Sequence, residues 1–149
     1  MRLTLYTDYS LRVLIYLAQN ADKVVTISEL ADFYRISRNH LVKVVHELGL
    51  SGYVQTTRGK HGGIRLARPA DQIVIGEVVR RTEPDFDLLE CLNPVADRCV
   101  ITNVCKLKSV LAEARDNFLG QLDGYTLADL TVRSAASSPA FKSIPILHG

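Results

Sequence analysis

The residues best suited to chemistry are three cysteines, Cys91, Cys99 and Cys105, the only three in the chain and all within fifteen residues. Zinc sites usually include a closer pair such as C-x2-C, whereas the spacing here is C-x7-C-x5-C. Three thiolates on one loop can hold an iron–sulfur cluster and leave one iron open to a different ligand. The pattern therefore favours a metal or cluster site. It leaves two alternatives, redox-active thiols and reduced cysteines that fill apolar space.

A second candidate site is the polar face of a helix-forming segment. Its apolar positions follow helical spacing and are Leu41, Val44, Val45 and Leu48. Away from them lie Arg38, Asn39, Lys43 and His46. Base edges in the major groove offer donors and acceptors, and asparagine pairs with adenine as arginine does with guanine. Ser37 is the expected N-cap, where a hydroxyl and free backbone N–H groups can meet a phosphate.

The next stretch predicts a β-hairpin with a basic tip. Strand-forming residues at 53–57 and 64–67 flank a glycine-rich turn at 58–63. Cationic side chains there would follow the DNA backbone or enter the minor groove, where arginine reads groove width. With the helix included, the candidate DNA contacts are Ser28, Ser37, Arg38, Asn39, His40, Lys43, Arg58, Lys60, His61, Gly62, Gly63 and Arg65.

Apolar spacing and capping residues predict the elements that position both sites. Helices are expected at 8–20, 27–34, 37–48 and 75–82, over a long segment from 106, and at 126–131. Thr26 and Glu29 fit a capping box, and Gly49 and Gly52 are expected to end the third helix. Helix, helix, turn, helix and hairpin in this order describe a winged helix-turn-helix. The expected fold class is mainly α with a small β-hairpin, a winged helix-turn-helix plus a long dimerisation helix.

The chain is expected to have four parts. Residues 1–82 form the DNA-binding domain, 83–105 the cysteine-bearing loop, 106–132 the dimerisation helix with a short helix, and 133–149 a flexible tail. The long helix carries an apolar stripe of Leu107, Val110, Leu111, Ala114, Phe118 and Leu122. Such a stripe suits a homodimer, which would place two recognition helices about one DNA turn apart. Packing onto the first helix of the same chain is the alternative.

Charge is divided unevenly along the chain. Residues 35–68 carry seven Lys or Arg and one acid, whereas eleven acids outnumber eight bases from residue 69 onward. This division supports a polyanion-binding module joined to a second part. No apolar run is long enough to span a bilayer and no signal peptide is evident, so we expect a cytoplasmic protein without membrane contact. No Ser-His-Asp set, carboxylate pair or phosphate loop supports an enzyme.

Three segments occur together with the three cysteines: Thr7-Asp8-Tyr9-Ser10-Leu11-Arg12, Ile36-Ser37-Arg38-Asn39-His40-Leu41-Val42-Lys43 and Arg58-Gly59-Lys60-His61-Gly62-Gly63-Ile64-Arg65-Leu66. In combination they resemble the NsrR-type repressors, nitric-oxide sensors of the bacterial regulator family that also contains the iron–sulfur protein IscR. The resemblance covers about residues 1–132. It implies a homodimeric winged-helix repressor that binds operator DNA with its cluster intact. Nitric oxide would nitrosylate the cluster and release the DNA.

The resemblance also implies the cluster ligands. Cys91, Cys99 and Cys105 would hold it, with Asp8 of the other subunit as the fourth ligand. IscR-like members instead use a histidine three residues after the last cysteine, where this chain has Lys108. That departure favours NsrR and makes [4Fe–4S] the expected cluster rather than [2Fe–2S]. The segment between Cys91 and Cys99 is longer than is usual in the family.

Alternatives to this ligand set remain open. Asp8 also suits an ordinary role as a helix N-cap or as a charge that favours the helix start. Asp97 and Glu90, both near the cysteines, are rival fourth ligands. The alternative function is a winged-helix redox or metal sensor in which the cysteines bind zinc or act as reactive thiols.

Overall fold

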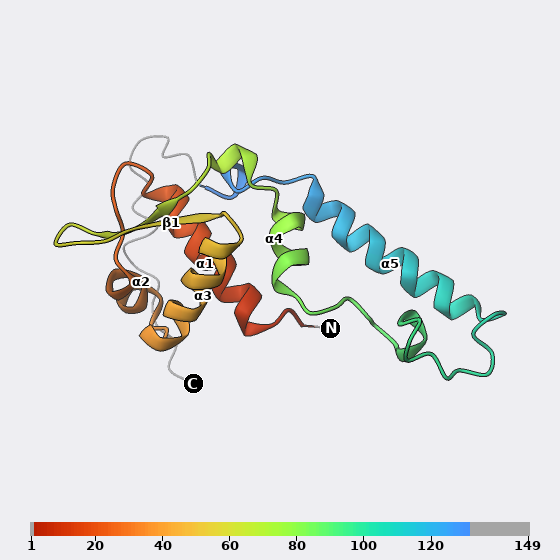
Figure 1. Ribbon diagram of the computed structural model, residues 1–149. Helices are drawn as coiled ribbons and strands as arrows, with labels where there is room; N and C mark the ends of the chain where they lie inside the picture. The colour runs from red at the N-terminus through yellow and green to blue at the C-terminus, as the bar shows by residue number, and fades with distance from the viewer. Residues whose placement is uncertain (1, 132–149) are drawn as a thin grey trace, which may run out of the picture.

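The computed structural model describes residues 2–131 as a mainly helical chain with one antiparallel hairpin (Figure 1). The helices are α1 Leu5–Gln19, α2 Ile27–Tyr34, α3 Arg38–Leu50, α4 Ile75–Thr82 and α5 Lys106–Asp123. The strands are β1 Val54–Thr57 and β2 Gly63–Leu66. Short 3-10 helices occupy η1 Ala70–Gln72, η2 Glu90–Leu92 and η3 Ala128–Leu130. This order confirms the expected fold class. The tail predicted at 133–149 lies outside the described residues.

Helix α1 begins three residues earlier than expected, because Thr4 provides its cap. The Thr4 hydroxyl accepts a hydrogen bond from the backbone N–H of Thr7 at 3.2 Å. Of the two ordinary roles expected for Asp8, the N-cap is therefore excluded. Asp8 lies in the first turn of α1, where its charge still favours the positive end of the helix dipole.

The helix-turn-helix ends differ slightly from the predicted ones. Thr26 caps α2 by accepting from the N–H of Glu29 at 3.1 Å, as half of the predicted capping box. The Glu29 carboxylate instead accepts from Tyr16 Oη at 2.8 Å and Lys23 Nζ at 2.6 Å. Gly49 does not end α3, which continues to Leu50. Gly52, with φ +75°, forms the turn that follows and needs the conformational freedom of glycine.

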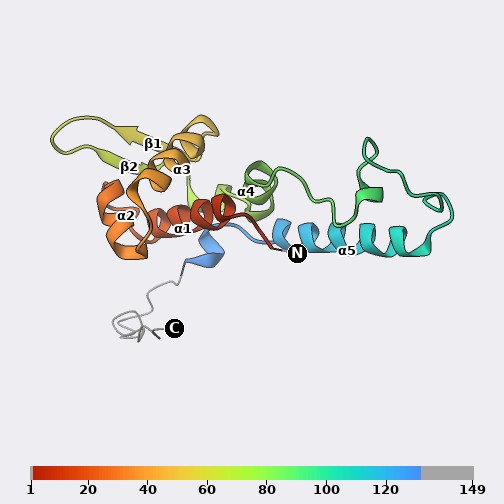
Figure 2. The same cartoon turned by 90° about the horizontal axis from the view of Figure 1, so that it is seen from below.

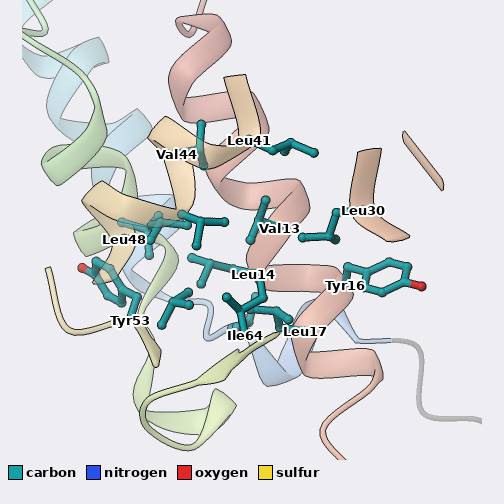
Figure 3. Packing of buried hydrophobic residues seen from close by; sticks show 14 of the residues in the cluster. Val13, Leu14, Tyr16, Leu17, Leu30, Leu41, Val44, Leu48, Tyr53 and Ile64 are labelled. Carbon is teal, nitrogen blue, oxygen red and sulfur yellow. The ribbon is translucent and has the colours of Figure 1, made fainter. Parts of the chain in front are cut away.

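The core lies between α1, α3 and the base of the hairpin (Figure 3). Leu14 of α1 and Leu41 of α3 are fully buried, and Ile64 of β2 is 1% exposed. A third backbone segment joins the hairpin, because Val25 and Ile64 exchange N–H···O bonds of 3.0 and 2.7 Å. The hairpin is therefore anchored in the domain and is not a free ribbon.

Helix α5 contacts the rest of the chain mainly at its C-terminal end. There Arg80 of α4 donates two hydrogen bonds to the Asp123 carboxylate, at 2.5 and 2.7 Å. Of the predicted stripe, Phe118 and Leu122 are partly buried and Leu122 packs on the core, whereas Leu107 is 56% and Val110 49% exposed. The predicted apolar stripe is thus covered at one end and open at the other. None of the helices in residues 2–131 is both long and apolar enough to cross a bilayer.

Candidate nucleic-acid interface and cysteine loop

The recognition face of α3 is fully presented to solvent. Ser37, Arg38, Asn39 and Lys43 are exposed, and within residues 2–131 their side chains make no hydrogen bond or ion pair with other parts of the protein. The opposite face is buried through the four predicted apolar residues. Cationic and amide groups held on a rigid helix without internal partners are available to an external polyanion.

The start of α3 has the features of a phosphate contact. Ser37 occupies the N-cap position, but its hydroxyl makes no capping bond. Its backbone carbonyl accepts from the N–H groups of His40 and Leu41, both at 3.1 Å. The N–H groups of the first helical residues have no intrahelical acceptor, and they point in the same direction as the positive end of the helix dipole. Ser28 is likewise exposed, on α2.

His40 differs from its neighbours on α3, because its ring lies beside α1. The centroid of its ring is 6.2 Å from that of Tyr9. A small cavity of about 160 Å³ lies here, lined by Leu5, Tyr6, Tyr9, His40, Lys43 and Val44. The side chain of His40 is exposed but adjoins the α1–α3 contact, whereas His46, six residues further along the helix, is exposed.

The wing carries the remaining predicted contacts. Arg58, Lys60, His61 and Arg65 are exposed, and the hairpin tip extends outward at the α2 end of the molecule (Figure 2). The two glycines serve the hairpin itself. A Cβ on Gly62 would lie 2.3 Å from the carbonyl oxygen of Thr57, and one on Gly63 would lie 2.5 Å from that of Val25. Only glycine permits this close packing of backbone at the wing.

The three cysteines occupy one irregular loop at the opposite end of the molecule from the wing (Figure 2). Cys91 lies in η2 and is half-buried, Cys99 is exposed, and Cys105 is the N-cap residue of α5. All three are free thiols, which suits an iron–sulfur donor set in kind. In residues 2–131, however, no three His, Cys, Asp or Glu side chains come together as a metal shell. Binding a cluster would therefore require the loop to draw its thiols together.

The carboxylates of Asp8 and Asp97, two of the candidate fourth ligands, have different hydrogen-bond and ion-pair partners. Asp8 forms a half-exposed ion pair with Arg12, at 2.8 Å between Asp8 Oδ2 and Arg12 Nη2. Asp97 accepts from the Thr102 hydroxyl at 2.6 Å, from Lys108 Nζ at 3.0 Å and from the N–H of Cys99 at 3.0 Å. These bonds lower the pKa of Asp97 to about 2, the Thr102 hydroxyl contributing most. Arg12 also donates from Nε to Asp8 Oδ1 at 2.9 Å, so both oxygens of each carboxylate are occupied. Asp97 is the less available of the two as a ligand, because its side chain is 13% exposed against 39% for Asp8 and because three donors hold it.

Sequence reasoning missed the contacts that join the cysteine loop to α1. Glu83, the first residue after α4, accepts from the backbone N–H of Thr4 at 2.8 Å and from its hydroxyl at 3.0 Å. Thr7 donates to Thr82 at 2.9 Å in the interior. Threonines give no long-range signal in a single sequence, because capping and turn roles explain them equally well. The Asp97–Lys108 pair was also missed, because its two residues are 11 positions apart and Asp97 lies in an irregular segment with no periodic pattern.

Comparison with known proteins identifies the group to which these features belong. The family model of Rrf2, described as an iron-dependent transcriptional regulator, matches residues 3–133. The HTH-type transcriptional regulator NsrR of Bacillus licheniformis is 53% identical over 131 residues, which cover 87% of this chain and 92% of that protein. NsrR of Bacillus subtilis is also 53% identical over 131 residues, covering 87% and 90%.

Solved structures show the same fold. CymR of B. subtilis, the global cysteine regulator, matches with a TM-score of 0.72 at 24% identity, covering 87% of this chain and 95% of that one. IscR of T. potens matches with a TM-score of 0.69 at 22% identity, covering 95% and 96%. The matched family and the NsrR relatives are transcriptional regulators, and the chain is a transcriptional regulator and not an enzyme. The chain belongs to the Rrf2 family of transcriptional regulators, in the group of the NsrR proteins.

Proposed function

We propose that this protein is a cytoplasmic repressor that binds operator DNA through α3 and the wing and is released by nitric oxide acting at an iron–sulfur cluster. The observation that carries the DNA-binding part is the recognition face of α3, where Arg38, Asn39 and Lys43 stand exposed without internal partners. Their chemistry matches the donors and acceptors of base edges. The wing cations Lys60 and Arg65 supply phosphate contacts, which fix the register of the protein on the duplex.

A homodimer explains the open end of α5. Leu107 and Val110 leave an apolar surface exposed near the start of the helix, and Val104 just before it is 84% exposed. A second copy that covers this surface would remove apolar area from water and fix the distance between two recognition helices. Operator affinity would then depend on the geometry of the dimer.

The sensing part rests on the cysteine loop and on family membership. Cys91, Cys99 and Cys105 would hold the cluster, expected to be [4Fe–4S] because Lys108 replaces the histidine of the other ligand set. Asp8 of the partner subunit is the proposed fourth ligand. To serve as a ligand, its carboxylate must leave a two-point contact with Arg12, and water screens this pair because the two side chains are 39% and 44% exposed. When bound, the cluster would supply iron that reacts with nitric oxide.

Hydrogen bonds and helix packing within the chain connect the cysteine loop to the recognition helix α3. Glu83 and Thr82, at the root of the cysteine loop, are hydrogen-bonded to Thr4 and Thr7 at the start of α1. Helix α1 in turn packs against α3. A change in the loop or in the ligation of Asp8 would therefore reach the helix that supports the recognition face. The operator and the sensing site are then coupled, and the coupling must be reciprocal in free energy.

The test is anaerobic DNA binding with and without a stoichiometric nitric oxide donor, with visible absorption followed in the same sample. The DNA is a duplex selected from a random library by the anaerobic, cluster-loaded protein. We expect binding and cluster absorption to fall together. Cys91→Ala, Cys99→Ala and Cys105→Ala should each lose both, whereas Val100→Ala, at an exposed position of the same loop, should keep both. A cysteine variant that still binds DNA tightly would contradict the switch.

The alternative is a sensor that uses the same cysteines as zinc ligands or reactive thiols. It is favoured by one observation, that Cys99 is exposed and free. Iron, sulfide and zinc analysis of the anaerobically purified protein separates the two functions. Zinc without sulfide, or three thiols that react with no metal present, would reassign the cysteines and leave the DNA-binding proposal intact.

A further inference from the structure

We infer that Asp97 and Lys108 form a brace that fixes the loop between Cys99 and Cys105 and so positions two of the three proposed cluster ligands. The inference rests on the proposed iron–sulfur function. Neither residue is proposed as a ligand; both act on the cysteines through the backbone.

The Asp97–Lys108 brace is completed by the side chain of Thr102, which contacts both residues. Lys108 Nζ donates to Asp97 Oδ2 at 3.0 Å and to the Thr102 hydroxyl oxygen at 2.6 Å. The Thr102 hydroxyl donates to the same Asp97 oxygen at 2.6 Å. The Asp97 side chain is 13% exposed and that of Lys108 is 32% exposed. This ion pair is therefore more protected from water than the ion pair of Asp8 and Arg12, at 39% and 44%.

The second carboxylate oxygen connects the brace to a cysteine. Asp97 Oδ1 accepts from the backbone N–H of Cys99 at 3.0 Å. Lys108 lies in the first turn of α5, the helix whose N-cap residue is Cys105. One carboxylate thus ties the backbone of Cys99 to the helix that begins beside Cys105. Partners of this kind, which hold ligands without binding metal, fix the orientation of metal sites elsewhere.

The long segment before Cys99 forms a turn that places Asp97 within hydrogen-bond distance of Cys99 and Lys108. Asn93 Oδ1 accepts from the N–H of Val95 at 2.9 Å and of Ala96 at 3.3 Å. The Asn93 carbonyl accepts from the N–H groups of Ala96 at 3.2 Å and Asp97 at 3.0 Å. The additional residues between Cys91 and Cys99 are therefore a turn with its own hydrogen bonds, and Asp97 lies at its end.

The brace lowers the entropic cost of gathering the thiols. A free loop must lose backbone freedom when its ligands converge, and this loss of entropy opposes binding. Hydrogen bonds that already restrict the segment from Cys99 to Cys105 reduce that cost in advance. Removal of Lys108 would leave Asp97 largely covered without its cation, so the carboxylate would turn outward and release Cys99.

The test compares Lys108→Met, which keeps most of the aliphatic stem, with Lys108→Arg, which keeps the charge. Lys106→Met is the matched control, because Lys106 is exposed on the same turn and its side chain has no hydrogen-bond partner within residues 2–131. Two quantities are measured. One is the hydrogen-exchange rate of the Cys99 amide in the metal-free protein. The other is the rate at which a chelator removes iron from the reconstituted protein, followed by absorption with iron and sulfide analysis.

We expect the Cys99 amide to exchange about tenfold faster in Lys108→Met, as for loss of one charge-assisted hydrogen bond. The chelator should remove iron several-fold faster, Lys108→Arg should restore most of both values, and Lys106→Met should match the parent. Unchanged exchange in Lys108→Met overturns the brace. Faster exchange with unchanged iron loss overturns its positioning role. If the parent protein takes up no iron and sulfide, the proposed sensing function fails, and the exchange comparison still decides the brace.

Discussion

The hydroxyl of Thr7 donates to Oγ1 of Thr82 over 2.9 Å, and this buried bond joins α1 to the last residue of α4. The Thr82 hydroxyl in turn donates a hydrogen bond to the carbonyl oxygen of Val78 at 2.9 Å. Both threonines are buried, at 0% and 6% exposure. The point where the cysteine loop leaves the domain is thus fixed to the first turn of the helix that carries Asp8.

Replacing Thr82 by valine should destabilise the protein by about 1–2 kcal/mol, because the buried Thr7 hydroxyl loses its acceptor while side-chain volume is kept. Only Thr4 Oγ1, at 3.1 Å from Thr7 Oγ1, remains within reach. Urea unfolding measures the change. Thr57→Val, at an exposed strand position, is the control and should stay within about 0.5 kcal/mol of the parent. Equal midpoints for Thr82→Val and the parent would show that the bond contributes nothing.

Asn39→Ala should weaken operator binding by about 1–3 kcal/mol, and the loss should be confined to one base pair. The reason is that a bidentate amide contact recognises one base, and Asn39 is exposed on the recognition face of α3. Binding to a set of operators with single substitutions measures it. A uniform loss across the set would place Asn39 on the phosphate backbone.

Lys60→Ala should weaken binding to all sequences about equally and reduce the salt slope by about one unit. Lys60 lies at the exposed tip of the hairpin, where a phosphate contact carries no sequence information. The dissociation constant measured over a range of salt concentrations gives the slope. Lys106→Ala, at the far end of the molecule, should leave it unchanged. An unaltered slope for Lys60→Ala would remove the wing tip from the phosphate contacts.

The stability of the domain should fall with rising pH in the alkaline range because of Tyr16. Burial, together with the hydrogen bond to the Glu29 carboxylate, raises the pKa of Tyr16 from 10.0 to about 12. The unfolded chain therefore loses this proton first, and the stabilisation present below about pH 10 is lost as the pH rises to about 12.

Denaturant midpoints from pH 8.5 to about 12 measure this effect against the reference titration of tyrosine. Tyr16→Phe should flatten the alkaline decline and cost about 1 kcal/mol at neutral pH through the lost hydrogen bond. Tyr125→Phe, at a position 45% exposed, is the matched control and should keep the decline. A decline of the same size in Tyr16→Phe would assign it to another group.

Periodicity and turn residues were enough to predict the helices and the hairpin, because each has a strong local pattern. Leu41 and Leu48 mark the buried face of α3, and Gly59, with φ +109°, marks the wing turn. Local pattern alone did not decide between the two ordinary roles expected for Asp8, the N-cap and a charge in the first turn of the helix. An acid at a helix start suits a cap, and nothing local showed that Thr4 would take that place. The predicted DNA contacts on α3 and the wing are exposed as required, and their contact with DNA stays a prediction.

The links between distant segments could not be predicted from one sequence. Glu83 and Thr4 meet across 79 positions, and Arg80 and Asp123 across 43. Such pairs depend on how helices cross, which propensity and capping do not specify. The hydrogen bonds within the cysteine loop could not be predicted either. Spacing showed that three thiols share one loop, but not that Asp97 would be bonded to Cys99 and Lys108.

The Arg80–Asp123 contact makes α5 a lever arm with its pivot at one end. Gly76 allows this pivot, since a Cβ there would collide with the Asp123 carboxylate. An α-helix of 18 residues is about 27 Å long, so a tilt of about 10° moves its far end by about 5 Å. The cysteine loop is attached to that far end (Figure 2). Any small tilt of α5 at the Arg80–Asp123 contact would therefore become a displacement of several ångströms at the cysteine loop.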